Sequence, residues 1–336
     1  MNKKWLDDIS EDIKHLIRKS GSYNPAEAIA AQHQLALAVQ EPIRAGILDG
    51  LIVDKVFTPM KFEPGVIPEF PLDIVEPGTE DEYAAYTVPN YGYIPQRHVD
   101  GDYLTVPTYD IAAAIDWSLK YSRDCRWPLI VRALYVLEQM FVKKHNYDGF
   151  RCLIAAGADR NLLVTDSYAP NGFFTKRLVS LLKLGMRRGG GGNSASLNRI
   201  QATHIFISPE GYEDVRSWDL TQIDDLTRNE IFHSEENVIQ IFGVELVPLD
   251  ELGVGRSYQH YYTDTLGGTM GPGDEEICIA VDLNDQSGMS FVMPVREEVT
   301  IYPDESLHRQ RKQGFYGWAE QGFAVLDNRK VLIGSF

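Results

Sequence analysis

The stretch ATHIFISPEGYEDVRSWDLTQIDDL, residues 202–226, decides the fold more than any other part of this chain. Residues 203–207 form a short apolar run rich in β-branched residues, which is typical of a buried strand. Ser208 then offers a side-chain oxygen to the first free N–H groups of a helix, and Pro209 suits the first helical position. The pattern predicts a strand that runs directly into a capped helix over residues 210–218. No catalytic motif interrupts this unit, so we interpret it as scaffold.

The chain is long and apolar enough for one large domain or two ordinary ones. It has 336 residues, of which 44% are hydrophobic, and a chain of this size can bury a core of its own. Its longest apolar stretches, such as residues 129–142, contain charged residues and fall short of the roughly 18 residues that a bilayer span needs. The N-terminal residues alternate acids and bases without an apolar run. We therefore expect no membrane insertion, no secretory signal and a protein that stays in the cytoplasm.

The charge balance is strongly acidic. The formal net charge is −16, from 48 acidic and 32 basic residues. A sequence-reading nucleic-acid binder needs a basic face that neutralises phosphates, so this balance argues against one. It is compatible with a container for nucleic acid, because an acidic inner wall repels packed DNA and keeps it mobile.

The sequence predicts no catalytic, cofactor or metal site. Cys125, Cys152 and Cys278 are far apart and have no histidine at ligand spacing, so we expect buried thiols in a reducing compartment. The histidines stand singly, without a paired or nucleophile motif, although a spatial Ser/His/Asp arrangement stays open. The acidic clusters at residues 219–225 and 274–276 lack the spacing of a calcium loop.

Residues 187–194, RRGGGGNS, are the strongest hint of binding chemistry. Glycine lets backbone N–H groups approach an anion, but the loop lacks the Gly-Lys-Ser/Thr ending of a phosphate-binding loop and the glycine spacing of a dinucleotide turn. We interpret it as a flexible surface loop. A soluble α+β enzyme that binds a phosphorylated ligand remains an alternative.

Helices and strands can be placed along the rest of the chain. Asn24 and Pro25 predict a helix over residues 26–37 that Pro42 disturbs. The strongest helix is predicted over residues 124–145, and a second piece over residues 147–156 is predicted to end at Gly157 in the left-handed conformation. Strands are predicted at residues 103–107, 298–302, 323–326 and 331–333, with a turn at Asp327 and Asn328 joining the last two.

Residues 57–107 differ from the rest in being rich in both proline and aromatic residues. Such a segment cannot form a helix or a central strand. Disordered segments lack aromatic residues, and a long structureless loop counts against a compact domain unless another chain stabilises it. We interpret the segment as an extended arm or hairpin that lies on a neighbouring subunit.

Several segments resemble, in the same order, the major capsid proteins of tailed bacteriophages, which share the Hong Kong 97 fold. They are the proline-rich arm, the long helix ending LIAAG, the unit IFISPEGYEDVRSW followed by DLTRNEIF, the segment FGVELVPLDELGVG, and the closing GFAVLDNRKVLIG. Together they span roughly two-thirds of the chain, which carries more weight than any single motif. The resemblance implies an α+β fold of Hong Kong 97 type.

The resemblance also implies a division of the chain. Residues 1–55 would be an N-terminal arm, and residues 56–107 would be the extended E-loop, which in this family reaches over an adjacent subunit. Residues 108–157 and 295–336 would form the peripheral domain with its long spine helix. Residues 158–294, a region of α+β character, would form the axial domain.

The resemblance implies a structural protein and not an enzyme. Its function would be to self-assemble, as hexamers and pentamers, into the icosahedral head shell that encloses phage double-stranded DNA without sequence-specific binding. The implied partners are a separate scaffolding protein, a portal and, as a further candidate, a cement protein. The protein would be assembled in the host bacterial cytoplasm and would end in the virion. An encapsulin-like nanocompartment shell is an alternative with the same fold.

Assembly contacts are expected from aromatic residues of the arm and from a basic and aromatic region near the C-terminus. The expected residues are Phe57, Phe62, Phe70, Tyr91, Tyr93, Arg309, Arg311 and Trp318. We interpret Trp218, Trp318, Phe315 and Tyr316 as core or subunit contacts, since few basic residues lie near enough to make them a stacking platform for single strands.

Overall fold

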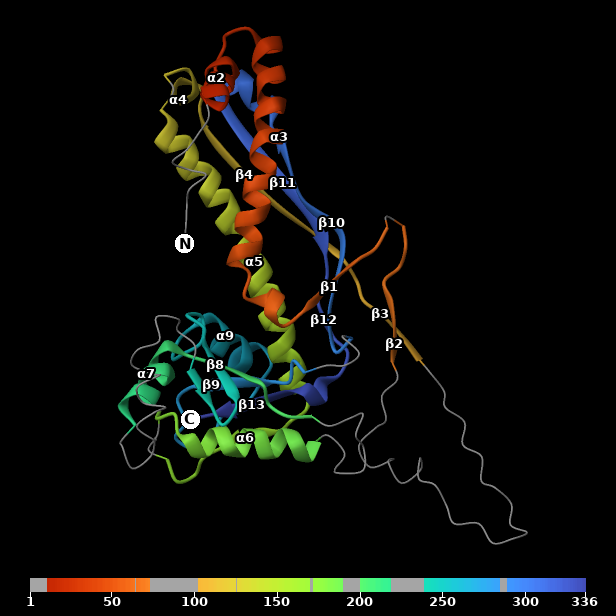
Figure 1. Cartoon of the computed structure of the whole chain (residues 1–336), viewed down its shortest axis with the longest axis vertical. Helices are drawn as coiled ribbons and strands as arrows, with labels where there is room; N and C mark the ends of the chain where they lie inside the picture. Colours follow the sequence, from red (N-terminus) through yellow and green to blue (C-terminus); the bar gives the residue numbers. More distant parts are fainter. Residues whose placement is uncertain are drawn as a thin grey trace, which may run out of the picture. The chain divides into compact units, whose positions relative to one another are not determined.

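The computed structural model divides into two compact units by its internal contacts (Figure 1). The structure describes residues 11–63, 65–72, 102–124, 126–169, 172–189, 200–218, 239–284 and 289–336. Unit 1 comprises Met1–Pro68, Thr105–Gly149 and Val292–Ala324. Unit 2 comprises Glu69–Leu104, Phe150–Phe291 and Val325–Phe336.

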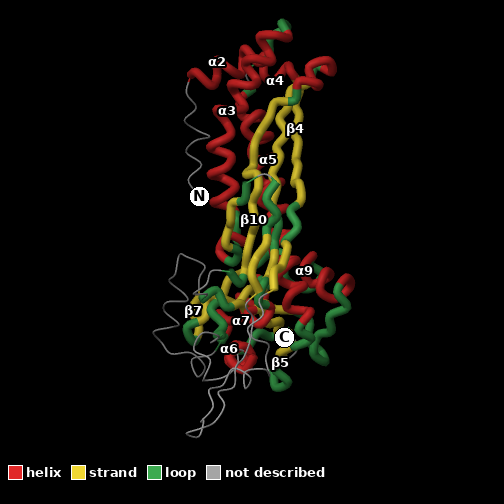
Figure 2. Tube along the Cα trace, turned by 90° about the vertical axis from the view of Figure 1, so that its right-hand side faces the viewer, coloured by secondary structure: helices red, strands yellow, loops and turns green. Residues whose placement is uncertain are grey.

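Unit 1 combines long helices with a sheet of long strands (Figure 2). Its helical elements are α2 (Glu11–Ser20), α3 (Pro25–Gly50), η1 (Val53–Lys55), α4 (Leu119–Arg123), η5 (Glu305–Gln310) and the first part of α5 (Trp127–Asp159). Its strands are β1 (Thr58–Lys61), β4 (Tyr109–Ser118), β10 (Phe291–Pro303) and β11 (Lys312–Gln321), in the order β1-β10-β11-β4. The strand β11 is antiparallel to both of its neighbours, and β1 is parallel to β10.

One face of this sheet is covered by α3 and α5, because each helix presents an apolar stripe to it. The buried cluster includes Leu35, Val39, Ile43 and Ile47 of α3, Ile130, Leu134, Leu137 and Phe141 of α5, and Ile111, Val299, Ile301, Phe315 and Ala319 of the strands. Ile17 of α2 is buried in the same cluster. The described part of the expected N-terminal arm is thus packed into the core of unit 1.

Glycines set the spacing between α3 and α5. A Cβ added to Gly46 would lie 2.6 Å from the carboxyl carbon of Glu138, and one added to Gly50 would lie 3.1 Å from Val142. Real Cβ atoms essentially never come within 3.0 Å of another atom, and a 3.1 Å contact is tighter than most, so a side chain at either position would require its neighbour to shift. The two helices therefore pack as closely as they do because these positions carry no side chain.

The helix α3 begins as predicted but ends later. Asn24 caps it, with its side-chain oxygen accepting a hydrogen bond from the Ala26 backbone N–H at 3.3 Å. The prediction that Pro42 disturbs the helix is wrong, because α3 continues to Gly50. A proline inside a helix costs about 3 kcal/mol. Val39, Ile43 and other buried side chains around it offset that cost through their contacts in the core.

The helix α5 is one helix of 33 residues, as the resemblance implied for the long helix ending LIAAG. The prediction from the sequence pattern of two pieces with a left-handed ending at Gly157 is wrong. Gly157 lies within the helix. A Cβ there would lie 2.8 Å from Cγ1 of Ile333, so the glycine permits close packing inside unit 2. The same residue type serves at helix ends and at close contacts, and only the tertiary structure distinguishes the two.

Unit 2 is built around a sheet of short strands in the order β5-β13-β9-β6-β8-β7. These strands are β5 (Leu163–Thr165), β6 (His204–Ile207), β7 (Ile239–Ile241), β8 (Val244–Pro248), β9 (Ile277–Val281) and β13 (Val331–Ser335). The helical elements are α6 (Lys176–Gly189), α7 (Pro209–Ser217), α9 (Ser257–His260), η4 (Tyr261–Thr265), η6 (Asn328–Lys330) and the last part of α5.

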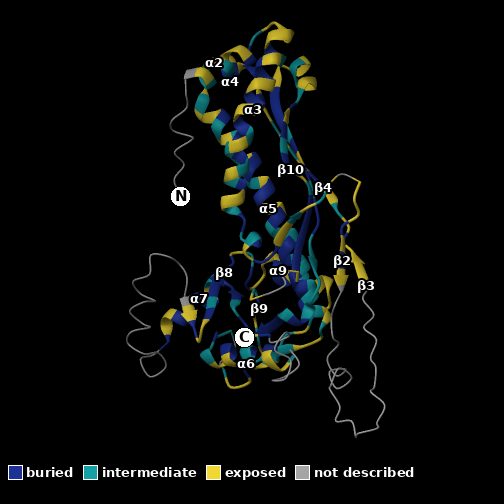
Figure 3. Ribbon diagram, turned by 45° about the vertical axis from the view of Figure 1, so that its right-hand side comes forward, coloured by how far each residue is buried: buried dark blue, intermediate teal, exposed yellow. Residues whose placement is uncertain are grey.

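Both faces of this sheet are covered (Figure 3). On one face, α6 and α7 contribute Leu178, Leu182, Met186, Tyr212 and Val215 to a cluster with Ile205, Leu246, Cys278 and Leu332 of the strands. On the other face, the Phe206 ring lies 5.2 Å from that of Phe150, which in turn lies 5.6 Å from the ring of Tyr258. Every residue of β9 and β13 is buried.

The strand and capped helix predicted from the sequence are confirmed. The strand β6 ends at Ile207, and Ser208 accepts a hydrogen bond from the Gly211 backbone N–H at 3.0 Å. Pro209 is the first residue of α7, and Trp218 follows its last residue. The Trp218 indole N–H donates a hydrogen bond to the Phe174 carbonyl at 3.0 Å, which connects the end of α7 to the core of unit 2.

The predicted strands near the C-terminus are present, but the last two join different sheets. The strand β12 (Ala324–Val325) pairs with β10, whereas β13 pairs with β9 and β5. Asp327 caps η6 between them by accepting a hydrogen bond from the Arg329 backbone N–H. Residues 325–336 therefore group with unit 2.

The two ends of the proline-rich segment pair with each other. The strands β2 (Glu69–Leu72) and β3 (Asp102–Thr105) form a two-stranded sheet, and β3 confirms the strand predicted at residues 103–107. The expected E-loop between them, residues 73–101, lies outside the described residues, as do Tyr91 and Tyr93. The glycine-rich residues 190–192 also lie outside them.

Candidate assembly surface

The sheet of unit 1 carries exposed aromatic side chains on the face opposite α3 and α5. Along β11, Phe315 and Ala319 are buried against the helices, and Trp318 points the other way with 43% of its surface exposed. Alternation along a strand places Tyr316 on the same face as Trp318. The Tyr316 ring stacks on that of Tyr302 in β10 at 5.6 Å, and Tyr302 is 39% exposed.

Small residues flank these rings on the neighbouring strands. Trp318 pairs with Ala112 of β4 on one side and with Thr300 of β10 on the other. Tyr316 pairs with Ala114 and with Tyr302. Ala112 and Ala114 are exposed and too small to cover a neighbouring ring. We name the set of Ala112, Ala114, Thr300, Tyr302, Tyr316 and Trp318 the outer aromatic face.

Ion pairs lie at both ends of this face. Lys312 and Asp116 form one with Nζ and Oδ2 2.5 Å apart. At the other end, Arg296 contacts Glu320 at 2.8 Å, and the Thr108 hydroxyl donates to the same carboxylate at 2.6 Å. The hydrogen bond from Thr108 and the charge of Arg296 lower the pKa of Glu320. An apolar centre with a charged rim is the usual anatomy of a protein–protein interface.

The size of the outer aromatic face limits the free energy that it can contribute to association. A fully buried tyrosine or tryptophan removes about 150–250 Å² from water, so three half-exposed rings can remove on the order of 250 Å² more. At about 25 cal/mol per Å², this burial is worth about 6 kcal/mol before the costs of association. A stable interface buries more than 1,000 Å² in total as an order of magnitude. The outer aromatic face is therefore the size of the centre of a contact, and a complete contact needs further residues.

The expected assembly residues fall into distinct environments. Phe57 is only 2% exposed, and its ring meets that of Phe323 edge-on at 5.3 Å. Phe70 is buried as well, and Phe62 is half-buried. Phe57 and Phe70 thus pack within the chain and offer no surface to a neighbour.

Three of the expected residues are exposed in unit 1. Arg309 belongs to η5, and Arg311 follows it with a left-handed backbone, φ 55°. Both precede β11, the strand that carries Trp318. Of the aromatic residues interpreted as core or subunit contacts, Trp218 and Phe315 are buried, which leaves Trp318 and Tyr316 at the surface.

Sequence reasoning missed Tyr302 and the alanines of β4. The alternation of Val299 and Ile301 with Thr300 and Tyr302 was the available signal for the outward direction of Tyr302. Its partner could not be found in this way, because the stacking depends on the register of β10 against β11. That register contains irregularities between Val295 and Thr300, which no periodic pattern announces.

The described residues contain little that points to catalysis. Among them, no cluster of histidine, cysteine, aspartate or glutamate is suited to hold a metal ion. Within the same residues, no helix combines the length and apolar character needed to cross a membrane. Burial raises the pKa of the Cys152 thiol to about 11 and that of Cys278 to about 12, so both are protonated at neutral pH. Cys125 lies outside the described residues.

Comparison with known proteins gives matches in structure alone. No protein-family model and no curated protein sequence matches the chain. A solved structure from Microbacterium phage Oxtober96 is 12% identical and has a TM-score of 0.56, with 85% of this chain and 90% of that chain covered.

Two further structures are described as capsids. A chain of the cyanophage Pam1 capsid asymmetric unit is 12% identical with a TM-score of 0.53, and the match covers 82% of this chain and 87% of that one. A chain of the capsid of an empty GTA particle is 10% identical with a TM-score of 0.52, with 85% and 90% covered. The chain therefore has the fold of these capsid subunits, and the α+β fold class expected from the resemblance is confirmed.

Proposed function

We propose that this chain is the major capsid protein of a tailed bacteriophage and that it self-assembles into the icosahedral head shell around double-stranded DNA. The observation that carries the proposal is the match to capsid subunits along nearly the whole of both chains. The identity is only 10–12%, so the likeness lies in the fold and not in the amino acids. The outer aromatic face supplies an independent argument, since it is an apolar surface that the chain leaves exposed.

The same proposal assigns roles to the parts of the chain. Subunits associate as hexamers and pentamers, and residues 56–107 act as the E-loop that reaches over a neighbouring subunit. Arg309, Arg311 and Trp318 lie on exposed parts of unit 1 and contribute to contacts between subunits. The domain boundaries inferred from the sequence belong to this proposal too, with residues 108–157 and 295–336 as the peripheral domain and residues 158–294 as the axial domain.

The proposed partners and location of the protein follow from its role as a subunit of a head shell. A separate scaffolding protein directs assembly, a portal occupies one vertex, and a cement protein is a further candidate. The net charge of −16 suits a wall that encloses DNA without adsorbing it. The subunit is made and assembled in the host bacterial cytoplasm and ends in the virion.

The alternatives are less well supported. An encapsulin-like nanocompartment is not favoured, because the structures compared above come from phages and from a GTA capsid. A non-enzymatic role agrees with the fold of these capsid subunits. The phosphate-binding enzyme depended on the loop at residues 187–194, most of which lies outside the described residues.

Negative-stain electron microscopy of the full chain tests the proposal. The protein is expressed alone and together with the products of neighbouring genes. Closed shells, tubes or hexameric and pentameric rings are the expected result, and the diameter of closed shells separates a phage head from a nanocompartment. A uniform monomer or dimer under all conditions, stabilised by a phosphorylated ligand, would contradict the proposal and favour the enzyme.

A further inference from the structure

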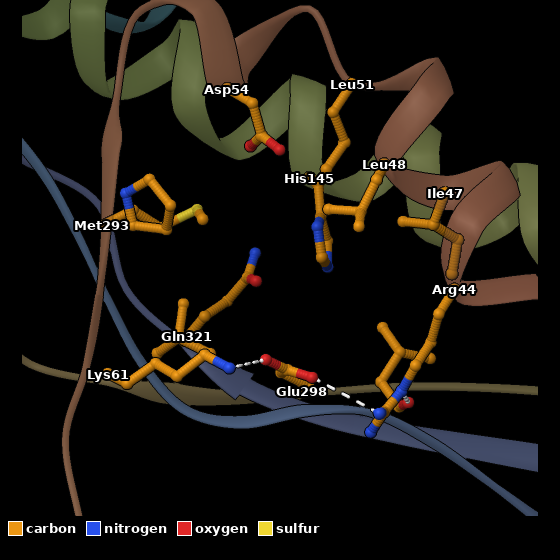
Figure 4. A pocket seen from close by; sticks show the side chains of 13 residues that line it. Arg44, Ile47, Leu48, Leu51, Asp54, Lys61, His145, Met293, Glu298 and Gln321 are labelled. Carbon is orange, nitrogen blue, oxygen red and sulfur yellow. Dashed lines mark hydrogen bonds and ion pairs between the residues drawn. The ribbon is translucent and has the colours of Figure 1, made fainter. Parts of the chain in front are cut away.

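Unit 1 contains a cavity of about 230 Å³ between the end of α3 and the sheet (Figure 4). Ile47 and Leu48 of α3, with Leu51 directly after it, line it on one side, and Met293 of β10 lines it on another. Most of its wall is therefore apolar. Its remaining lining comes from η1, β1, α5 and β11.

Three polar side chains point into this space from three different elements (Figure 4). His145 of α5 is 5% exposed, and neither of its ring nitrogens has a hydrogen-bond partner. Gln321 of β11 is 3% exposed, and its Nε2 has no partner. The Oδ1 atom of Asp54 in η1 is buried without a partner too. A buried polar atom left in this state costs about 1–3 kcal/mol, so the protein gains by having the space occupied.

The unpartnered atoms include donors as well as acceptors. A neutral imidazole has one N–H donor and one acceptor nitrogen. The Gln321 amide adds a donor, and the Asp54 carboxyl adds an acceptor. A hydroxyl group both donates and accepts, so it can satisfy two of these atoms at once.

The charges around the cavity favour an uncharged occupant. Glu298 contacts Lys61 on one side and Arg44 on the other, with the Arg44 contact at 3.4 Å. Arg44 also contacts Glu41 at 3.7 Å, so the two cations are balanced by two carboxylates and neither is left for an anion. Burial lowers the pKa of His145 to about 4, so its ring is neutral at pH 7 and provides no positive charge.

The volume is suited to one small ring. An apolar cavity of about 150 Å³ in another protein holds a benzene molecule. The cavity here is larger and has unpartnered polar groups in its wall, which leaves room for a ring with a polar substituent.

We propose that this cavity is a binding site for a small uncharged aromatic alcohol of the phenol class, with the ring against Ile47, Leu51 and Met293 and the hydroxyl between His145 and Gln321. The apolar wall holds the ring, and the unpartnered nitrogens select for the hydroxyl. All of the lining residues belong to unit 1 of one chain.

Calorimetric titration of the full chain with three related compounds tests the site. The compounds are p-cresol, toluene, which lacks the hydroxyl, and 4-hydroxybenzoate, which carries a negative charge. We expect p-cresol to bind saturably and about tenfold or more tighter than toluene, and 4-hydroxybenzoate not to bind. The absence of saturable p-cresol binding would overturn the proposal, and would mean that water alone occupies the cavity.

Two variants test the selectivity for the hydroxyl. Gln321→Met and His145→Leu replace unpartnered polar groups with apolar ones of similar size, which is commonly neutral or stabilising. We expect both to bind toluene about as well as the wild type does and to lose most of the preference for p-cresol. Equal preference for p-cresol in the wild type and both variants would overturn the proposed position of the hydroxyl.

Photoaffinity labelling of the wild type locates the ligand without any substitution. It works both on free subunits and on assembled shells. A phenol that carries a diazirine is bound, irradiated and mapped by peptide mass spectrometry. Labelling concentrated on residues 44–54 and 293–299, and suppressed by p-cresol, supports the proposal. Labelling spread over other segments, or unchanged by p-cresol, contradicts it.

Discussion

The two sheets of this molecule differ in how many of their faces the chain itself covers. The sheet of unit 2 is packed on both faces, and β9 and β13 are buried at every position. The sheet of unit 1 is packed by α3 and α5 on one face and exposes Trp318 and Tyr302 on the other. Substitutions in unit 2 should therefore change folding, whereas substitutions on the outer aromatic face should change association and leave folding nearly unaltered.

Truncating a central side chain of the unit 2 sheet should have the largest effect on folding. Phe206 is 1% exposed and packs edge-on against Phe150. The Phe206→Ala variant should lose about 3–5 kcal/mol of unfolding free energy, because it leaves a cavity among rigid neighbours. Urea denaturation of unassembled subunits measures this loss.

Phe242 provides the matched control in the same unit. It is 56% exposed and has a left-handed backbone, φ 53°, which asparagine tolerates. The Phe242→Asn variant should change the unfolding free energy by no more than about 0.5 kcal/mol. Equal losses in the two variants would mean that the sheet of unit 2 is not the rigid core described here.

Acidification should weaken unit 1 through His145. Burial lowers the pKa of this ring from 6.5 to about 4, and the charge of Asp148 opposes the shift. Between these two values the unfolded chain binds a proton that the folded chain does not, so stability falls as the pH falls from about 6.5 to about 4. The fall attributable to this residue is at most about 3 kcal/mol.

Comparison with the His145→Leu variant isolates that contribution, since the carboxyl groups around the cavity, Asp54 and Glu298, also titrate as the pH falls. Urea denaturation at a series of pH values should show a smaller decrease for the variant than for the wild type. Parallel curves for the two proteins would indicate that His145 is accessible to protons in the folded state.

A side chain at the closest approach of α3 and α5 should have an intermediate effect. The Gly46→Val variant brings a Cβ within 2.6 Å of the Glu138 carboxyl group, which is buried. Overpacking of this kind costs about 1–3 kcal/mol. Ala45→Val, at the adjacent exposed position, should cost less than about 1 kcal/mol through helix propensity alone. Thermal unfolding of both variants under identical conditions distinguishes a clash from a general intolerance of valine in α3.

Removing a charge from the rim of the outer aromatic face should have only a small effect on folding. Lys312 and Asp116 are both about half exposed, with 48% and 42% of their side chains accessible. The Lys312→Ala variant should lose about 0.2–1 kcal/mol, and less at high salt. A loss above 2 kcal/mol, well beyond that order of magnitude, would show that this ion pair is part of the core of unit 1.

The sequence was sufficient for features that depend on neighbouring residues. Ser208 and Pro209 mark the start of α7 by their own chemistry, and Asn24 does the same for α3. The sequence was insufficient for features that depend on contacts with segments far away along the chain. Gly157 resembles a helix ending until Ile333 is placed against it, and Phe57 resembles an exposed arm residue until Phe323 covers it.

The outer aromatic face shows the same limit. Trp318 was expected at a contact from its residue type and its region of the chain. Its neighbours Tyr302, Ala112 and Ala114 belong to strands far away in the sequence, and they join it only through the registers of β10 and β4 with β11. The cavity beside His145 depends on six separate elements and has no local signature at all.

The most direct test of the central claim is the sedimentation of assembled particles from Trp318→Thr subunits. Threonine is polar and favourable in a strand, so it removes the exposed ring while keeping β11. We predict circular dichroism and urea denaturation close to those of the wild type, together with a loss of rapidly sedimenting shells, whereas Phe242→Asn subunits still assemble. Shells that form as readily from Trp318→Thr subunits as from the wild type would contradict the account.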